Sequence, residues 1–388
     1  MNAKTNIKVI FALTLVHFTG DFYSAFAAPL MPVFVNKLSL SMTQVGLMMG
    51  LMRFLSFVVQ PAVGFLADRY QTRFFVLGGL GLSVVFVPLS GLAPTFWMLV
   101  LFLSIGSFGS SMFHPSVTGM VPLYAGRNTG LSMSIFNTGG TLAFGIGPIF
   151  ISWFVARFGL TAMPFTMLIG LTAWLYVYQS VPIPVSEGYH LRGFWVSLDE
   201  MFGSVWKPLV LMWVVMVIRS AVGQSFLTFM PIHLSDKNFS LVQIGSVTSI
   251  FVVSGTVSGL LAGFLSDRVE GKFIFIVAHA LMAPTLLVYL WASSAWVYTA
   301  AALAGFMVFA TIPVSIVMAQ HLAPRGKSMV ASFMMGFAYG LGGMLTPITG
   351  RLADMFGIQT VLWFLCFVPL ITVILSFFFP NLNTSRNT

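Results

Sequence analysis

The chain alternates between long apolar runs and short polar segments. Each run is close to the roughly 20 mostly apolar residues that a membrane-spanning helix needs. The runs cover 8–35, 43–67, 74–92, 96–121, 128–154, 160–181, 207–234, 241–265, 273–291, 295–321, 327–351 and 358–379. They are too long and too continuous for the strands of a membrane barrel. The pattern therefore predicts an all-α membrane protein with twelve transmembrane helices.

The second half of the chain repeats the first. The segment Gly64-Phe65-Leu66-Ala67-Asp68-Arg69 recurs 199 residues later as Gly263-Phe264-Leu265-Ser266-Asp267-Arg268. The same offset, without gaps, pairs Pro32 with Pro231, Ser41 with Ser240, Gln44 with Gln243, Gly46 with Gly245, Trp97 with Trp296, Gly106 with Gly305, Pro148 with Pro347 and Phe165 with Phe364. We therefore expect two parallel six-helix bundles related by a pseudo-twofold axis, with a substrate site between them near the bilayer midplane.

This repeat divides the chain into an N-terminal bundle over residues 1–181, a linker over 182–206 and a C-terminal bundle over 207–388. Apolar linker residues recur at helical spacing among charged ones, which predicts an amphipathic helix on the cytoplasmic membrane surface. These residues are Phe194, Trp195, Leu198, Met201 and Phe202. A plain tether without a function of its own is the alternative interpretation.

Composition excludes a water-soluble protein. Hydrophobic residues make up 58% of the chain and charged residues 7%, with a mean hydropathy of +0.96, whereas soluble domains are about one quarter charged. The net charge of +9 lies in short loops and not on one solvated face, so we expect no nucleic-acid partner. The N-terminal run contains Asp21, which argues against a cleaved signal peptide and favours a retained first helix.

Loop charges predict the orientation, because Lys and Arg are enriched in cytoplasmic loops. With the N-terminus inside, Arg53 and Arg219 fall within helices, and the outer loops hold Lys37, Arg157, Lys237 and Arg351. The other twelve of the 18 Lys and Arg are inside: Lys4, Lys8, Arg69, Arg73, Arg127, Arg192, Lys207, Arg268, Lys272, Arg325, Lys327 and Arg386. We expect a multi-pass protein of the cell (inner) membrane with both termini cytoplasmic.

Helix 1 carries the first candidate site, because ionisable groups at membrane depth are costly and usually face a cavity. His17 and Asp21 are four residues apart, so they share one face and can form a hydrogen bond. An apolar site favours the neutral carboxyl group, which lets Asp21 take up and release a proton. We predict Asp21 as the proton-coupling group and His17 as its modulator. An inert polar pair is the alternative.

Two arginines lie within predicted helices. Arg219 is the repeat partner of Gly20, next to Asp21, so the two charges could face one cavity and interact directly or through substrate. Arg53 shares a face of a regular helix with Ser56 and Gln60. A guanidinium group suits carboxylates and phosphonates, which makes an anionic or zwitterionic substrate plausible. A structural pair, or for Arg219 a side chain reaching toward an interface, is the competing reading.

The repeated hexapeptide predicts a gate on the cytoplasmic side. Small Gly64 and Gly263 permit close helix approach, and the charges that follow can pair in one conformation and separate in the other. The gating candidates are Gly64, Asp68, Arg69, Arg73, Gly263, Asp267 and Arg268. A positively charged turn that only sets topology is the alternative.

The segment from Gly64 to Arg73 resembles the signature that follows helix 2 in the major facilitator superfamily, and this resemblance covers nearly the whole chain. Several first-half segments resemble the fosmidomycin resistance-type branch, whose members are proton-driven exporters of drugs and small toxic compounds. They are His17 to Tyr23, Gln60-Pro61, Phe113-His114-Pro115, Gly130 to Ser132, Asn137 to Gly140 and Gly145 to Pro148. The resemblance implies that His114 reaches the cavity, and Gln224 is a weaker cavity candidate.

We therefore expect a secondary transporter that exports a small organic compound in exchange for protons. Proton-coupled uptake of an organic anion through Arg53 and Arg219 is the alternative within transport, and a membrane sensor or scaffold is the alternative outside it. The sequence has no nucleophile elbow, P-loop or metal-ligand spacing. We expect no enzyme activity, no cofactor and no metal, with a small molecule, protons and lipid as partners of a monomer.

Overall fold

The computed structural model describes residues 5–70, 72–183, 203–323, 330 and 333–380, and within them it is helical throughout. Eleven helices of the described residues are long and apolar enough to cross a membrane. They are Ile7–Leu38, Met42–Ala67, Phe74–Leu92, Phe96–Ala125, Thr129–Phe158, Leu160–Ser180, Trp206–Asp236, Leu241–Ser266, Gly271–Trp291, Trp296–Leu322 and Ile358–Ser376. Each matches one predicted run to within a few residues.

The remaining predicted run, 327–351, begins outside the described residues and is broken where it is described. It contains a π-helical turn η6 (Phe333–Phe337), then α16 (Ala338–Met344) and α17 (Thr346–Phe356). It ends five residues later than predicted, at Phe356, and is followed by Gly357, whose φ of 81° is one that glycine adopts at low cost. The chain thus has the predicted twelve-helix, all-α fold.

Several spans are divided into shorter helices. The first consists of α1 (Ile7–Ser24) and α2 (Ala27–Leu38), and the second of α3 (Met42–Arg53), a π-helical turn η1 (Phe54–Val58) and α4 (Gln60–Arg69). Uninterrupted helices are α5 (Phe74–Leu89), α6 (Phe96–Ala125), α7 (Thr129–Phe158), α10 (Trp206–Asp236), α11 (Leu241–Ser266) and α12 (Gly271–Trp291). The others are α8 (Met167–Ser180), α13 (Trp296–Phe309), α14 (Thr311–Leu322), α18 (Ile358–Leu365) and α19 (Val368–Ser376).

The sequence repeat reappears in the local hydrogen bonds. Ser41 and Gln44 form a reciprocal capping box at the start of α3, and their repeat partners Ser240 and Gln243 form the same box at the start of α11. Lys37 donates to the Gly91 carbonyl at 3.0 Å, and Lys237 donates to the Leu290 carbonyl at 2.7 Å. Ser41 and Ser240, Gln44 and Gln243, and Gly91 and Leu290 are related by the repeat offset of 199 residues. Lys37 and Lys237 are 200 residues apart, one more than this offset.

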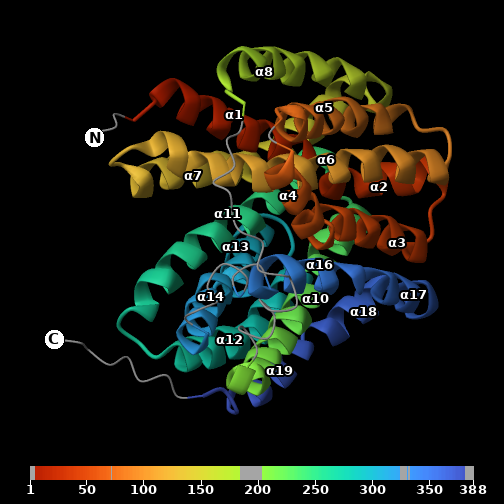
Figure 1. The fold of residues 1–388 in the computed structure, drawn as a ribbon. Coiled ribbons are helices and arrows are strands. Elements are labelled where there is room, and N and C mark those ends of the chain that lie inside the picture. Colours follow the sequence, from red (N-terminus) through yellow and green to blue (C-terminus); the bar gives the residue numbers. More distant parts are fainter. Residues whose placement is uncertain (1–4, 71, 184–202, 324–329, 331–332, 381–388) are drawn as a thin grey trace.

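Figure 1 places α1 to α8 in the upper part of the molecule and α10 to α19 in the lower part, with both chain ends on one side. The predicted linker helix lies within 184–202, outside the described residues. The division into bundles at residues 181 and 207 stays a prediction.

The two groups of helices meet at repeat-related glycines. A Cβ atom on Gly46 of α3 would lie 2.5 Å from the Thr346 carbonyl oxygen of α17. A Cβ atom on Gly245 of α11 would lie 2.5 Å from the Pro148 carbonyl oxygen of α7. Because these distances leave no room for a side chain, only glycine lets the backbones approach so closely. The contacts join the halves on the side that loop charges predict to be outside.

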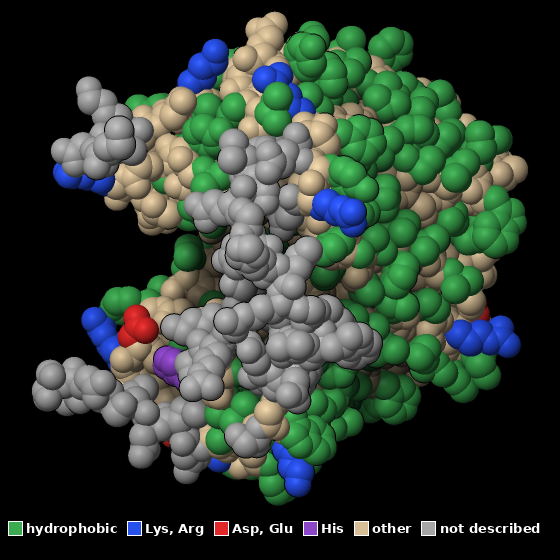
Figure 2. Space-filling model, in the orientation of Figure 1, with side chains coloured by type: hydrophobic (Ala, Val, Ile, Leu, Met, Phe, Trp, Pro, Cys, Tyr) green, Lys and Arg blue, Asp and Glu red, His purple; other side chains and the backbone are tan. Residues whose placement is uncertain are grey.

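A hydrogen-bonded clamp reinforces this closure. Asp354, near the end of α17, accepts hydrogen bonds from the backbone N–H groups of Met42 and Thr43 at 2.7 and 2.9 Å, and from the Thr43 hydroxyl at 2.5 Å. A carboxylate at the N-terminus of α3 also interacts favourably with the helix dipole. On the opposite side, where the chain ends lie, Figure 2 shows the surface hollowed between the two groups of helices.

We predict that Gly46→Ala opens the closed side. The added methyl group overlaps a backbone oxygen, so α3 and α17 must separate, at a cost of about 1–3 kcal/mol. Spin labels at the exposed positions Ser39 and Phe356 report the separation by double electron–electron resonance. Gly119→Ala is the matched control, since a Cβ atom there meets nothing within 4 Å. Equal distance distributions in the two variants would contradict the prediction.

Candidate functional site

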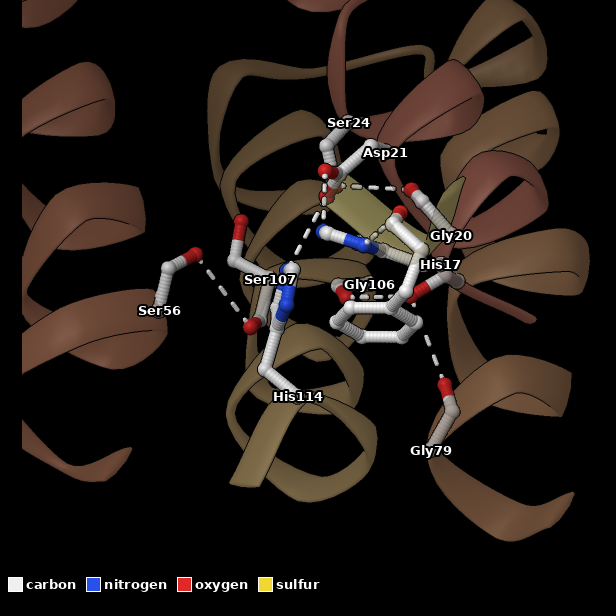
Figure 3. A network of polar contacts seen from close by, with 11 residues as sticks. His17, Gly20, Asp21, Ser24, Ser56, Gly79, Gly106, Ser107 and His114 are labelled. Carbon is white, nitrogen blue, oxygen red and sulfur yellow. Dashed lines mark hydrogen bonds and ion pairs between the residues drawn. The ribbon is translucent and has the colours of Figure 1, made fainter. Parts of the chain in front are cut away.

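Asp21 lies at the centre of a buried polar cluster in the first half (Figure 3). Its side chain is on α1, and the residue is 4% exposed. Oδ2 lies 3.2 Å from Nε2 of His17, one helical turn earlier, and Oδ1 lies 3.0 Å from Nε2 of His114 on α6. The structure thus brings together His17 and Asp21, as their spacing predicts, and adds a second histidine from another helix.

Helix α7 fixes the ring of His17 from the other side. Nδ1 of His17 lies 3.0 Å from the Phe136 carbonyl oxygen, and the Phe136 ring stacks on the imidazole with centroids 4.2 Å apart. Gly140, one turn further along α7, faces the same pair, because its Cβ atom would lie 2.6 Å from Nε2 of His17. A side chain at position 140 would therefore occupy the space of the cluster.

Close packing of α1 against α6 places His114 next to Asp21. A Cβ atom on Gly20 would lie 2.1 Å from the Phe113 ring, so the absence of a side chain lets this aromatic ring sit against α1. His114 follows directly and keeps 21% of its side chain exposed, more than His17 at 13%. Pro115 then packs against Gly64 of α4, at 3.2 Å from the position of a Cβ atom.

Among the described residues, the ligand atoms of His17, Asp21 and His114 lie close enough together to surround a metal ion. One ligand atom from each of His17, Asp21 and His114 lies within 4.8 Å of the others. The nitrogen–oxygen distances of 3.0 and 3.2 Å are those of direct hydrogen bonds, so the groups already satisfy one another. Sequence spacing missed this cluster because 93 residues separate His114 from Asp21. The absence of a metal stays a prediction.

Arg219 of α10 is buried at 2% exposure, and within the described part of the chain it has no carboxylate partner. Its Nη1 donates to the Val308 carbonyl oxygen at 2.7 Å, and its Nε has no partner. Asp21 is paired with the two histidines, so the direct contact between Asp21 and Arg219 is not formed in this conformation. The hydroxyl of Ser220, the residue after Arg219, donates to the Tyr339 carbonyl oxygen at 3.1 Å.

Arg53 lies where the two halves meet. Its guanidinium carbon is 6.0 Å from the centroid of the Tyr339 ring, and its side chain packs against Gly343. Its Nε is buried without a partner. Tyr339 therefore lies beside Arg53 of α3 through its ring and contacts Ser220 of α10 through its carbonyl. Repeat symmetry did not indicate this residue, because its partner in the first half is Gly140.

The π-helical turn η1 changes the expected neighbours of Arg53. A π turn winds more residues into each turn than an α-helix, so the regular spacing that placed Gln60 on the face of Arg53 was wrong. Ser56, inside the turn, donates to the Ser107 carbonyl of α6 at 3.3 Å, which Figure 3 also shows. Gln60 begins α4 and is partly buried. Gln224 is 1% exposed, and neither atom of its amide has a hydrogen-bond partner among the residues that the structure describes.

The gating candidates lie away from any described contact between the halves. Arg69 and Arg268 are exposed and lie against aromatic rings of their own segments, those of Tyr70 and Phe264. Arg73 donates to the Tyr178 carbonyl within the first half at 3.3 Å. Asp267 is exposed, Gly263 is partly buried near Pro313, and the side chain of Asp68 lies outside the described residues. The gating role of this motif stays a prediction.

We predict that Gly140→Ala disables the cluster while the fold survives. Its methyl group would lie 2.6 Å from Nε2 of His17 and 2.9 Å from Oδ2 of Asp21, so the imidazole must move. The proton-coupled transport that the sequence leads us to expect should fall at least about tenfold in liposomes, equivalent to ~1.4 kcal/mol. Gly130→Ala on the same helix meets nothing within 4 Å and should transport normally. Full activity in Gly140→Ala protein would refute this role of the glycine.

Comparison with known proteins identifies relatives over nearly the whole chain. A sequence profile described as Major Facilitator Superfamily matches residues 10–347. The chain is 25% identical over 392 residues to the Fosmidomycin resistance protein of Escherichia coli (strain K12), covering 98% of this chain and 94% of that protein. It is 25% identical over 332 residues to the Quinolone resistance protein NorA of Staphylococcus aureus (strain MSSA476), covering 82% and 81%.

Solved structures share the fold at lower sequence identity. A bacterial homolog to the human lysosomal transporter Spinster, in an inward-facing and unoccupied conformation, aligns with a TM-score of 0.82 at 16% identity and 97% coverage of both chains. The nucleoside transporter NupG aligns with a TM-score of 0.77 at 14% identity, covering 95% of this chain and 98% of that one.

Proposed function

The chain belongs to the Major Facilitator Superfamily, and we propose that it exports a small organic compound in exchange for protons by alternating access. As a member of that superfamily it is a multi-pass membrane transporter. The observation that carries the proposal is the carboxyl group of Asp21, buried at membrane depth between two histidines. A proton that neutralises this group removes a charge whose burial in an apolar environment is costly.

The arrangement of the halves supports alternating access. Contacts at Gly46, Gly245 and Asp354 close one side, and the other side is hollowed between the halves. We propose that the hollowed side is cytoplasmic, since loop charges place both termini there. This conformation would then accept substrate from the cytoplasm. We propose residence in the cell (inner) membrane as a monomer, with bundles over 1–181 and 207–388.

We propose that the substrate binds between the halves, near Arg53, Arg219 and Tyr339. The two guanidinium groups keep nitrogen atoms without partners, which is costly unless a ligand or water satisfies them. His114, Gln60 and Gln224 would supply further polar contacts. The named resistance functions of the relatives make fosmidomycin and a quinolone the first compounds to test.

Uptake of an organic anion together with protons is a second candidate. The observation that favours it is Arg219, a buried cation without a carboxylate partner, which an anionic substrate would neutralise. A sensor or scaffold without transport remains the alternative in which neither compound moves protons. The direction of proton flow relative to substrate separates exchange from uptake.

We predict that Asp21→Asn abolishes coupling. Wild-type protein in liposomes with a trapped pH-sensitive dye should move protons opposite to substrate when fosmidomycin or a quinolone is added. The isosteric amide cannot exchange a proton, so proton movement should fall at least about 100-fold, whereas substrate binding should persist. Proton flow in the direction of substrate would establish uptake, and no flow in wild type with any compound would favour the sensor.

We predict that Arg219→Gln weakens binding of anionic compounds more than of neutral ones. Loss of a buried charge-assisted contact should cost about 1.5–3 kcal/mol with a phosphonate or carboxylate, roughly 10- to 150-fold in affinity. Affinity is measured by scintillation proximity with a labelled compound. Arg157→Gln, at the exposed end of α7, is the control. Equal losses for anionic and neutral compounds would remove Arg219 from the substrate site.

A further inference from the structure

The two nitrogen atoms of the His17 ring have different partners. Nδ1 lies 3.0 Å from the backbone carbonyl oxygen of Phe136, and Nε2 lies 3.2 Å from Oδ2 of Asp21. A carbonyl oxygen can only accept a hydrogen bond. Nδ1 must therefore carry a hydrogen atom, and a neutral His17 would present a lone pair from Nε2 toward Asp21.

An ionised carboxylate oxygen also offers only lone pairs. Two facing lone pairs at 3.2 Å repel, so a proton must lie between Nε2 and Oδ2. It is held either as an imidazolium facing a carboxylate or as a neutral imidazole facing a carboxylic acid. Both forms contain one proton more than a neutral His17 beside an ionised Asp21.

We propose that the conformation with the predicted outer side closed carries this proton, shared between Nε2 of His17 and Oδ2 of Asp21, and that the Phe136 carbonyl positions it. The inference rests on the proposed proton coupling for its purpose in transport. It goes further by assigning the proton to two atoms, and by making His17 a carrier of the proton instead of a modulator of Asp21.

Few titratable or charged groups lie on the described helices around His17 and Asp21, and on α1 itself the other charged residue is Lys8, near the start of the helix. His114 is the titratable residue that faces Asp21 from α6, and its neutral form can donate from Nε2 to Oδ1 without an additional proton. Helices α5 and α8 also pack against α1 and carry no Asp, Glu, His, Lys or Arg. On α7 the one such residue is Arg157, near the far end of the helix.

Release of the proton would loosen α1 from α7. When the proton passes to water, His17 becomes neutral and Asp21 ionised, and the two contacts of the ring can no longer both be favourable. The ring must give up either the Phe136 carbonyl or Asp21. Helix α7 also carries Pro148, whose carbonyl meets Gly245 of the second half. Helix α7 thus contacts both His17, at the proposed proton site, and Gly245 of the second half.

Spectroscopy of the full-length protein in lipid nanodiscs tests the proposal directly. Histidine labelled with ¹⁵N gives nitrogen shifts that distinguish the two neutral tautomers from imidazolium, and His17→Gln identifies the His17 signals. Infrared difference spectra against Asp21→Asn identify the carboxyl C=O band. Spin labels at Ser39 and Phe356 confirm that the samples at neutral pH have the outer side closed.

Two results support the proposal: a His17 imidazolium with ionised Asp21, or a neutral Nδ1–H tautomer with a protonated carboxyl band that disappears in Asp21→Asn. Any form of neutral His17 beside an ionised Asp21 overturns it. His114→Gln is the matched control and should leave the shared proton in place. If the proton is found but Asp21→Asn transports with unchanged coupling, the proposed function fails while this assignment stands. If no shared proton is found but coupling is lost in Asp21→Asn, the proposed function stands and the assignment of the shared proton fails.

Discussion

Two backbone contacts hold the halves of this protein together on one side. Gly46 meets the carbonyl of Thr346, and Gly245 meets the carbonyl of Pro148, both at distances that exclude a side chain. In a membrane, where apolar surface gains little from leaving lipid, close backbone packing is a main source of helix association. The contacts are related by the internal repeat, so the seam is symmetric. Both contacts lie on the same side, and on the other side the surface is hollowed between the halves (Figure 2).

The second constraint is the cost of burying ionisable groups at membrane depth. Contacts with two histidines offset this cost for Asp21, and a backbone carbonyl in turn holds His17 in place. For Arg219 the cost is offset incompletely, with one carbonyl partner and an Nε atom left without one. Buried polar groups without partners are uncommon in native proteins and call for a specific explanation. The first half therefore has an internally satisfied cluster, and the second half has one that a ligand or water can complete.

Repeat-related residues build the same helical scaffold in both halves. The polar residues of the candidate sites lie at positions where the two halves differ. Gly20 and Asp21 in the first half correspond to Arg219 and Ser220 in the second, and Gly140 corresponds to Tyr339. Where the first half has a glycine facing Asp21, the second has a tyrosine whose ring centroid lies 6.0 Å from the guanidinium carbon of Arg53. The capping boxes at Ser41 and Ser240, by contrast, are the same in both halves. Symmetric positions thus maintain the fold, and asymmetric ones distinguish the proposed proton site from the proposed substrate site.

The sequence by itself determined the helices and their repeat, because each span needs a long apolar run and the two halves carry matching residues at a constant offset. It also determined the contact of His17 with Asp21, since one helical turn separates them. Only the tertiary structure placed His114, Phe136 and Tyr339, because these contacts join helices that are distant in sequence. It also placed Asp354 at the start of α3 and introduced a π turn after Arg53, which regular helical spacing could not anticipate. The physical reason is that hydrophobic periodicity encodes which segments enter the membrane, whereas packing between helices decides which polar groups meet there.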